Sequence, residues 1–450
     1  MSLKERLRQI DTNGQGTAET HSAKTSEFFQ TLKAKIHAEL INRIDLSNLF
    51  KIDRKQAEEQ IREILAGLLA QDRIPLNRAE EKRLLREVED ETFGLGPIEP
   101  LLADPTVSDI LVNHAKQVFV ERFGRLELTD VVFRDDAHLR QIIDRIVSRV
   151  GRRIDESQPM VDARLPDGSR VNAVISPLAL NGACLSIRKF KADPLKVRNL
   201  VSFGTINEEI AKILELIVRA KLNMIISGGT GSGKTTLLNI LSGFIPNSER
   251  IVTIEDAAEL QLQQRHVVRL ETRPSNLEGS GMISQRDLVR NALRMRPDRV
   301  IIGEVRGAEA LDMLQAMNTG HEGSLTTIHA NSTRDALYRL ETMILMAESN
   351  LVEWAINRQV ASAVDVIIQI SRMNDGVRRL VSLSEVTGME GNVVAMQDIV
   401  VFQQQGVTPE GKVIGEFKFT GVRPRFLDRL KTSGLLNGLR LTMFEEALKS

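Results

Sequence analysis

Eight residues in the middle of the chain constrain its fold more than any other feature. They fit the pattern G-x-x-x-x-G-K-[ST] and read Gly228, Gly229, Thr230, Gly231, Ser232, Gly233, Lys234 and Thr235. A strand-like apolar run, 222–227, precedes them, and a helical run that starts with Thr236 follows. Glycines let backbone N–H groups converge on phosphate oxygens without Cβ clashes, and the helix offers its positive end to the anion. The pattern predicts a phosphate-binding loop between a strand and a helix.

Each residue type in this loop has an expected chemical task. Lys234 is expected to reach the β and γ phosphates of a nucleotide, and the Thr235 hydroxyl is expected to ligate Mg²⁺. The predicted cofactors are ATP and Mg²⁺, and the binding residues are the loop together with Thr236. A GTPase would carry Asn-Lys-x-Asp to read its base, and the nearest match, 42–45, lies upstream of the loop inside a predicted helix. A glycine-rich turn beside an ordinary surface lysine is the other alternative, and the flanking strand and helix argue against it.

Two acidic residues follow buried strand-like runs farther along the chain. Glu255 follows 251–254, and Glu304 follows 300–303, where Gly303 and Glu304 occupy the place of the usual metal-holding Asp. A carboxylate at the C-terminal end of a central parallel strand faces the crevice where nucleotide binds. We predict that Glu255 polarises the attacking water and that Glu304 holds the metal. The residues alone also allow the two roles to be exchanged.

Two histidines bracket the next strand-like run, 323–328. His329 ends that run on the side expected for Glu255 and Glu304, where a hydrogen-bond donor could sense the γ-phosphate. His321 lies near the opposite end of the run. The two histidines are therefore not expected to share a metal, and zinc would need a third ligand.

Arginines provide candidates for a contact across a subunit boundary. Six of them cluster between residues 286 and 306, and most are expected to be solvated. Arg294 is the candidate chosen from this cluster to reach a phosphate of a neighbouring subunit, as arginine fingers do. Arg188 is a second candidate because it stands at the exit from a domain that is expected to abut the nucleotide crevice.

The hydrophobic periodicity changes along the chain and predicts an α/β protein of several parts. Helices and strands alternate in the last large part, which indicates a parallel sheet with helices on both faces. Within it, 364–386 is expected to form a hairpin at the edge of the sheet. The predicted parts are a mobile N-terminal segment (1–30), a helical bundle (31–93), an α+β domain (94–190), a linker (191–205), an ATPase domain (206–406) and a C-terminal tail (407–450).

Composition excludes several functional classes. Sixty Lys and Arg balance sixty Asp and Glu, and aromatic residues make up only 4%. A nucleic-acid motor needs a basic groove or stacking aromatics, so no nucleic acid is expected as a partner. No run approaches the ~20 apolar residues that span a bilayer, and no secretory leader is visible. With Cys184 as its single cysteine, the chain is expected to be cytoplasmic and to contain no disulfide.

Four segments, in order, resemble the Walker A, Asp box, atypical Walker B and His box of the type II/type IV secretion ATPases: 228–235, 251–256, 299–306 and 319–331. The resemblance extends upstream through 93–98, 165–170 and 185–190, covers roughly 33–400, and is greatest for the tight-adherence (Tad/Flp) pilus assembly ATPases. It implies a RecA-like P-loop NTPase domain and a homo-hexameric ring at the cytoplasmic face of the inner membrane. Such a ring moves platform proteins that assemble or retract pilin filaments. A type IV secretion ATPase shares all four boxes and stays the alternative, while the helical N-terminal unit favours the pilus.

Overall fold

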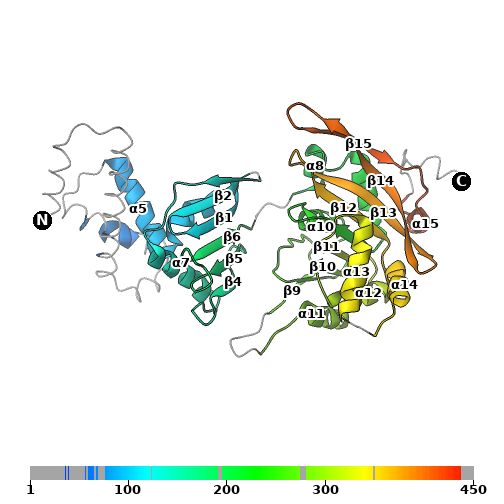
Figure 1. The fold of residues 1–450 in the computed structure, drawn as a ribbon, viewed down its shortest axis with the longest axis horizontal. Coiled ribbons are helices and arrows are strands. Elements are labelled where there is room, and N and C mark those ends of the chain that lie inside the picture. The colour runs from blue at the N-terminus through cyan, green and yellow to red at the C-terminus, as the bar shows by residue number, and fades with distance from the viewer. Residues whose placement is uncertain are drawn as a thin grey trace. The chain divides into compact units, whose positions relative to one another are not determined.

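The computed structural model describes residues 77–122, 124–190, 195–273, 280–347 and 350–436, together with a few positions between 36 and 68. The chain divides into two compact units, Met1–Phe190 and Lys191–Ser450, and each is described by itself (Figure 1). The mobile segment predicted over 1–30 and most of the predicted helical bundle lie outside the described residues. The described part of that bundle ends with α5 (Arg78–Phe93).

The first unit is built on a six-stranded antiparallel sheet in the order β3-β2-β1-β6-β5-β4. Helix α7 (Asp136–Arg149) buries its apolar stripe against this sheet, and the short helices η1 (Gly96–Ile98) and α6 (Glu99–Ala103) add to the same core. The strands are β1 (Val107–His114), β2 (Gln117–Arg122), β3 (Arg125–Leu128), β4 (Met160–Arg164), β5 (Arg170–Val174) and β6 (Cys184–Arg188).

Polar groups fasten α5 to α7. Arg145 donates from Nη1 to the carbonyl oxygens of Glu91 and Gly94, both at 2.7 Å, and so caps the C-terminus of α5. The buried His138 ring lies 2.9 Å from the Glu91 carboxylate. Beside them, burial and repulsion from Glu99 raise the pKa of Asp90 to about 6. The junction therefore holds acidic groups away from water.

The second unit is a nine-stranded sheet in the order β15-β14-β13-β12-β7-β11-β10-β8-β9. The pairs from β12 to β9 are parallel, and those from β12 to β15 are antiparallel. This confirms the α/β fold that the alternation of helices and strands predicts. The strands are β7 (Met224–Ser227), β8 (Ile251–Glu255), β9 (Val267–Glu271), β10 (Arg299–Val305), β11 (Leu325–Ile328), β12 (Val366–Arg372), β13 (Arg378–Glu390), β14 (Val393–Val407) and β15 (Val413–Phe419).

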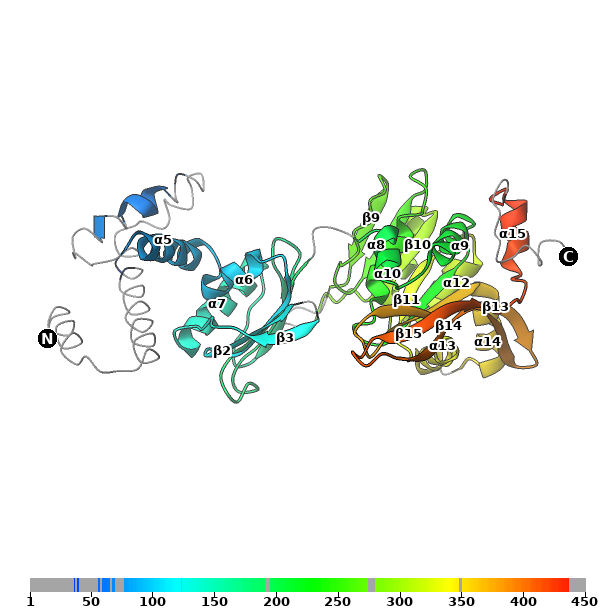
Figure 2. The same cartoon turned by 90° about the horizontal axis from the view of Figure 1, so that it is seen from above.

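Helices cover both faces of this sheet (Figure 2). Successive residues of β7 enter different cores, because neighbouring side chains in a strand point to opposite faces. One face packs against α8 (Val197–Ser202), α9 (Glu208–Arg219), α10 (Lys234–Ser242) and α15 (Phe426–Thr432). The other packs against α11 (Gln285–Ala292), α12 (Glu309–Asn318), α13 (Thr333–Ala347) and α14 (Glu353–Ala363).

The structure differs from the sequence prediction at three places in this unit. The hairpin expected at the sheet edge begins with β12, which pairs directly with β7 in the middle of the sheet, while β15 forms the edge. The segment expected as a linker contains α8, whose Leu200 is buried in the core. The segment expected as a tail supplies β15 and α15. Local periodicity predicts the strands of the hairpin but not their neighbours in the sheet, and it misses α8, β15 and α15, which are short and depend on long-range packing.

Candidate nucleotide-binding site

The predicted phosphate loop connects β7 to α10 at the carboxyl edge of the parallel strands. Gly231 and Gly233 have φ of +69° and +96°, a region that glycine enters without a steric penalty. A Cβ on Gly228 would run into the Ile370 carbonyl oxygen of β12. The backbone conformation and the closeness of β12 therefore both favour glycine in this loop.

The Lys234 ammonium lies inside the loop. Its Nζ donates to the carbonyl oxygens of Gly228 at 2.9 Å and Gly229 at 3.1 Å. The Ser232 hydroxyl donates to the same Gly229 oxygen at 2.8 Å and tightens the turn. Burial lowers the pKa of Lys234, and the negative charge of Glu304 opposes that shift. A cation thus stands where the loop and the N-terminus of α10 meet, which suits an anion.

Thr235 and Thr236 occupy the first turn of α10. Thr235 is half-buried, and Thr236 is exposed. Mg²⁺ in nucleotide sites takes one or two protein oxygens, and its other ligands are phosphate oxygens and water. The Thr235 hydroxyl and the Glu304 carboxylate are oxygen donors of the required kind, so the donor set fits the ion.

Glu255 is the last residue of β8 and only 3% exposed. Its Oε2 accepts hydrogen bonds from the backbone N–H groups of Glu259 at 2.6 Å and Leu260 at 2.8 Å. Its Oε1 is buried and has no hydrogen-bond partner within the described part of the chain. Burial raises the pKa of Glu255. One oxygen is therefore fixed while the other can take a proton, as a general base requires.

Glu304 lies inside β10 and not just past its end, which corrects the strand boundary expected from sequence. Its Oε2 accepts from Arg306 Nη2 at 2.7 Å, and Arg306 Nη1 donates to Asp256 at 3.3 Å. The strand order places β11 and then β10 beside β7, with β8 third. Glu304 is therefore closer to the phosphate-loop strand than Glu255 is, although Glu255 comes first along the chain.

His329 follows β11 directly and is half-buried. The Ile328 carbonyl oxygen accepts from the Gly228 N–H at 3.3 Å, so His329 stands beside the start of the phosphate loop. His321 precedes β11 at the other edge of the sheet, and its buried Nδ1 has no hydrogen-bond partner among the described residues. Within those residues no cluster of three or more His, Cys, Asp or Glu could hold a metal ion.

Of the two arginines predicted to reach a nucleotide, Arg188 belongs to the first unit, which does not contain the phosphate loop, and Arg294 lies away from the loop within the second unit. Arg188 ends β6 in the first unit, with its side chain 63% exposed and 3.9 Å from Asp109. Arg294 lies in the turn η2 (Leu293–Met295), just before the amino end of β10, and is exposed. That end is opposite to the edge that carries the loop. The structure thus separates Arg294 from the site that its own chain builds.

Arg306 and Arg378, by contrast, do contact the site. Arg306 forms ion pairs with both Glu304 and Asp256, although it belongs to the arginine cluster of which most members were expected to be solvated. Arg378 begins β13, and its Nε donates to the Gly231 carbonyl oxygen at 3.0 Å. This contact joins residues 147 positions apart, so no local pattern could reveal it.

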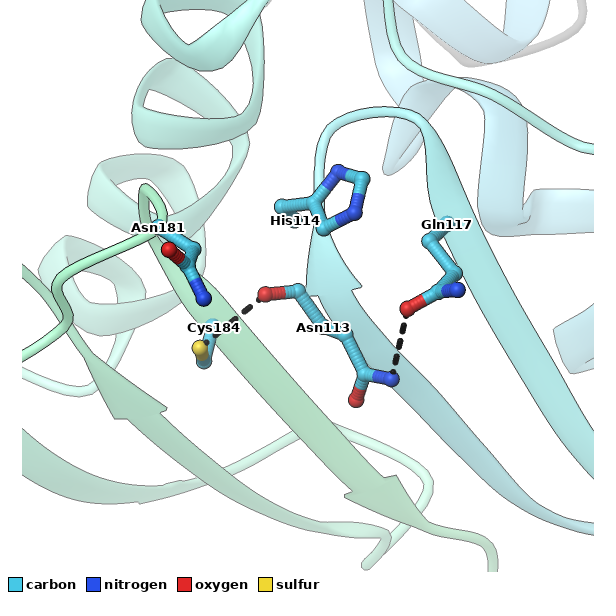
Figure 3. A pocket seen from close by; sticks show the side chains of 5 residues that line it. All are labelled: Asn113, His114, Gln117, Asn181 and Cys184. Carbon is cyan, nitrogen blue, oxygen red and sulfur yellow. Dashed lines mark hydrogen bonds between the residues drawn. The ribbon is translucent and has the colours of Figure 1, made fainter.

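A surface pocket in the first unit is lined by Asn113, His114, Gln117, Asn181 and Cys184 (Figure 3). Asn113 Nδ2 donates to Gln117 at 3.0 Å, and Cys184 Sγ donates to the Asn113 carbonyl oxygen at 3.2 Å. Its lining contains neither Lys nor Arg. The pocket therefore lacks the cation that a phosphate site needs.

Comparisons with known proteins identify a family and several relatives. Residues 91–408 match the family described as type II/IV secretion system protein. A Mycobacterium tuberculosis protein named for conjugal transfer is 40% identical over 318 residues, which are 69% of this chain and 90% of that protein. The type IV secretion system protein VirB11 of Bartonella henselae is 31% identical, over 64% of this chain and 92% of its own. The crystal structure of the VirB11 ATPase of Brucella suis is 28% identical, covers 64% of this chain and 94% of its own, and gives a TM-score of 0.35.

Proposed function

The chain belongs to the type II/IV secretion system protein family, and from this premise we propose that it is a motor subunit that hydrolyses ATP. The observation that carries the proposal is the arrangement at the carboxyl edge of the second sheet. There the structure brings together the loop that holds Lys234, the strand-end Glu255, Glu304 and His329. A phosphate cradle, two carboxylates and a hydrogen-bond donor are the parts that phosphoryl transfer to water needs.

Each of these residues has a proposed role. The amides of the phosphate loop and Lys234 hold the phosphates, and Thr235 and Glu304 hold Mg²⁺, which neutralises phosphate charge when it is bound. Glu255 polarises the attacking water and accepts its proton on Oε1, the oxygen that takes no other hydrogen bond. His329 senses the γ-phosphate. The nearness of β10 to β7 supports this division of roles, because the metal belongs beside the phosphates.

We further propose that six copies form a ring. A single phosphate loop leaves its crevice open to solvent, and water exclusion requires a neighbouring surface. Arg188 lies near the end of the first unit and is largely exposed, so movement about the connection between the units could carry it to a nucleotide. Arg294 could contact only a nucleotide of another subunit. Mass measurement with a non-hydrolysable nucleotide tests the ring, and a strictly monomeric protein with full ATPase activity would refute it.

Two assemblies are candidates for the system that this ATPase drives. The motif resemblance favours assembly of a Tad/Flp-type pilus through inner-membrane platform proteins, with retraction as an additional activity. The names of the relatives, conjugal transfer and VirB11, favour a type IV secretion system. Deleting the gene separates the two. Loss of pilus filaments under the electron microscope supports the first candidate, and intact filaments with lost substrate transfer support the second.

A peripheral position at the cytoplasmic face of the inner membrane follows from either candidate. None of the helices in the described ranges is both long and apolar enough to cross a bilayer. Fractionation of cells with and without the platform proteins tests this placement. Membrane association that persists in their absence would contradict it.

Hydrolysis itself is tested by Lys234→Ala. Loss of the ammonium removes charge stabilisation from the phosphates, so turnover should fall below detection while the fold persists. Lys212 of α9 is exposed, and Lys212→Ala is the matched control, with parent activity expected. A folded Lys234→Ala protein that releases phosphate at the parent rate would refute the proposed function.

A further inference from the structure

Arg378 lies along the phosphate loop, although no nucleotide-binding motif contains it. Besides the bond from its Nε to the Gly231 oxygen at 3.0 Å, its Cδ stands 3.0 Å from the position that a Cβ on Gly233 would take. The arginine stem therefore follows the loop from Gly231 to Gly233. Lys234, at the start of the adjoining helix, is another cation in contact with this loop.

Arg378 follows a turn between β12 and β13 that several hydrogen bonds hold in place. The Asp375 carboxylate is almost buried between β12 and β13, and accepts two bonds from Arg379 Nη1 at 3.0 and 2.9 Å. The same carboxylate accepts from the backbone N–H groups of Val377 and Val413, each at 3.0 Å. These bonds tie the turn to β15. The sheet and these bonds therefore fix the backbone of the turn from which the Arg378 side chain extends to the phosphate loop.

A second arginine stands directly opposite Arg378. Arg372, the last residue of β12, is its cross-strand partner in the antiparallel register. Arg is the side chain best suited to phosphate oxygens. The register therefore places two residues of this kind at the same end of the hairpin, one of them in contact with the phosphate loop.

The strand order indicates which part of the nucleotide lies here. His329 and Glu304 follow or belong to β11 and β10, on one side of β7, whereas Arg372 and Arg378 belong to the hairpin on the other side. In the proposed reaction, the bond to the γ-phosphate that hydrolysis breaks lies towards Glu304 and Glu255, the residues proposed to hold the metal and to polarise the water. Building on the proposed ATPase function, we propose that Arg378, with Arg372 beside it, binds the α-phosphate end of the nucleotide, the part that ATP and ADP share.

The proposal is tested by measuring affinity and turnover separately. Arg378→Gln is the informative variant because glutamine Nε2 occupies the place of arginine Nε and keeps a donor for the Gly231 oxygen, while the positive charge is lost. We expect about tenfold weaker binding of ADP and of a non-hydrolysable ATP analogue alike, since a charged hydrogen bond is removed. The turnover number at saturating ATP should stay within about twofold, because uniform binding acts on KM.

The control is Arg358→Ala, which removes an exposed arginine of α14 and should leave both affinities unchanged. Arg378→Ala should bind both nucleotides at least as weakly as Arg378→Gln does. Parent affinity in Arg378→Gln together with weak binding in Arg378→Ala would overturn the proposal, because Arg378 would then only support the loop. A much larger loss for the ATP analogue than for ADP would also overturn it. Failure of the parent protein to bind either nucleotide would instead refute the proposed function.

Discussion

Adding one methyl group to Gly303 should disable Glu255 without touching the phosphate loop. Gly303 of β10 lies beside Glu255 of β8, and a Cβ there would stand 3.0 Å from Glu255 Cγ, 3.6 Å from its Cβ and 3.7 Å from its Oε2. Carbon atoms in contact prefer about 3.5–4.0 Å. The Glu255 side chain must therefore move by roughly half to one ångström in Gly303→Ala.

The expected cost follows from how tightly Glu255 is held. Its Oε2 is fixed by two short bonds to the backbone N–H groups of Glu259 and Leu260, at 2.6 and 2.8 Å, which a shift of this size would stretch. Misplacing a catalytic group by about 1 Å lowers a rate by about 10²-fold. That factor corresponds to about 2.7 kcal/mol in the activation barrier. We expect the turnover number of Gly303→Ala to fall ten- to hundredfold.

The assay is steady-state phosphate release, with ADP affinity measured in parallel. Affinity should stay within about twofold because β10 is separated from β7 by β11. Gly406→Ala is the matched control, since Gly406 also lies in a strand and a Cβ there meets no atom within 4 Å. Folding of both variants is checked by circular dichroism at 25 °C. A folded Gly303→Ala protein with the parent turnover number would refute the argument that the placement of Glu255 limits the reaction.

Three further substitutions have expected outcomes. Glu255→Gln should bind ATP but not hydrolyse it, which filter binding and phosphate release distinguish. Burial raises the pKa of Glu255, so the stability that its neutral form contributes is present at low pH and is lost as the pH rises through the folded-state pKa. Glu255→Gln should therefore have a higher Tm than the parent at pH 8. Equal Tm values would contradict this. Glu304→Gln should require several-fold more Mg²⁺ for half-maximal hydrolysis, and an unchanged Mg²⁺ titration would count against Glu304 as a ligand. Burial and Glu99 raise the pKa of Asp90 from 3.8 to about 6, so ionised Asp90 should destabilise the first unit progressively as the pH rises between these two values. The Tm of Asp90→Asn should exceed that of the parent at pH 8, and the two Tm values should converge only below pH 3.8.

Local patterns were sufficient to predict the glycine-rich loop between β7 and α10 and the strands around it, although β10 extends past its expected end to include Glu304. Glycine spacing predicts the loop between 222–227 and the following helix, and the structure places β7 and α10 there. Buried apolar runs ending in acid predict Glu255 and Glu304 at one sheet edge. These features depend on residues within a few positions of each other, which is why sequence reveals them.

The rest depends on contacts between distant residues. The chain inserts β11 between β7 and β10, so the order of Glu255 and Glu304 along the chain is the reverse of their order from the phosphate-loop strand. Arg378 reaches Gly231 only because β12 pairs with β7. No periodicity specifies which strand becomes the neighbour of another, since that choice rests on the packing of the whole sheet.

The pairing of β7 with β12 also bears on the order in which the molecule is made. The bond from the Asn223 N–H to Asp365 spans 142 residues, and Met224 pairs with Val366 in the same region. During synthesis the strand that precedes the phosphate loop must wait for this partner, and contacts at such separation form late and slowly. Nascent chains shorter than this would expose one side of β7. We expect a fragment that stops at residue 350 to bind no ADP, and a ribosome-bound chain to gain nucleotide binding only after β12 has left the exit tunnel.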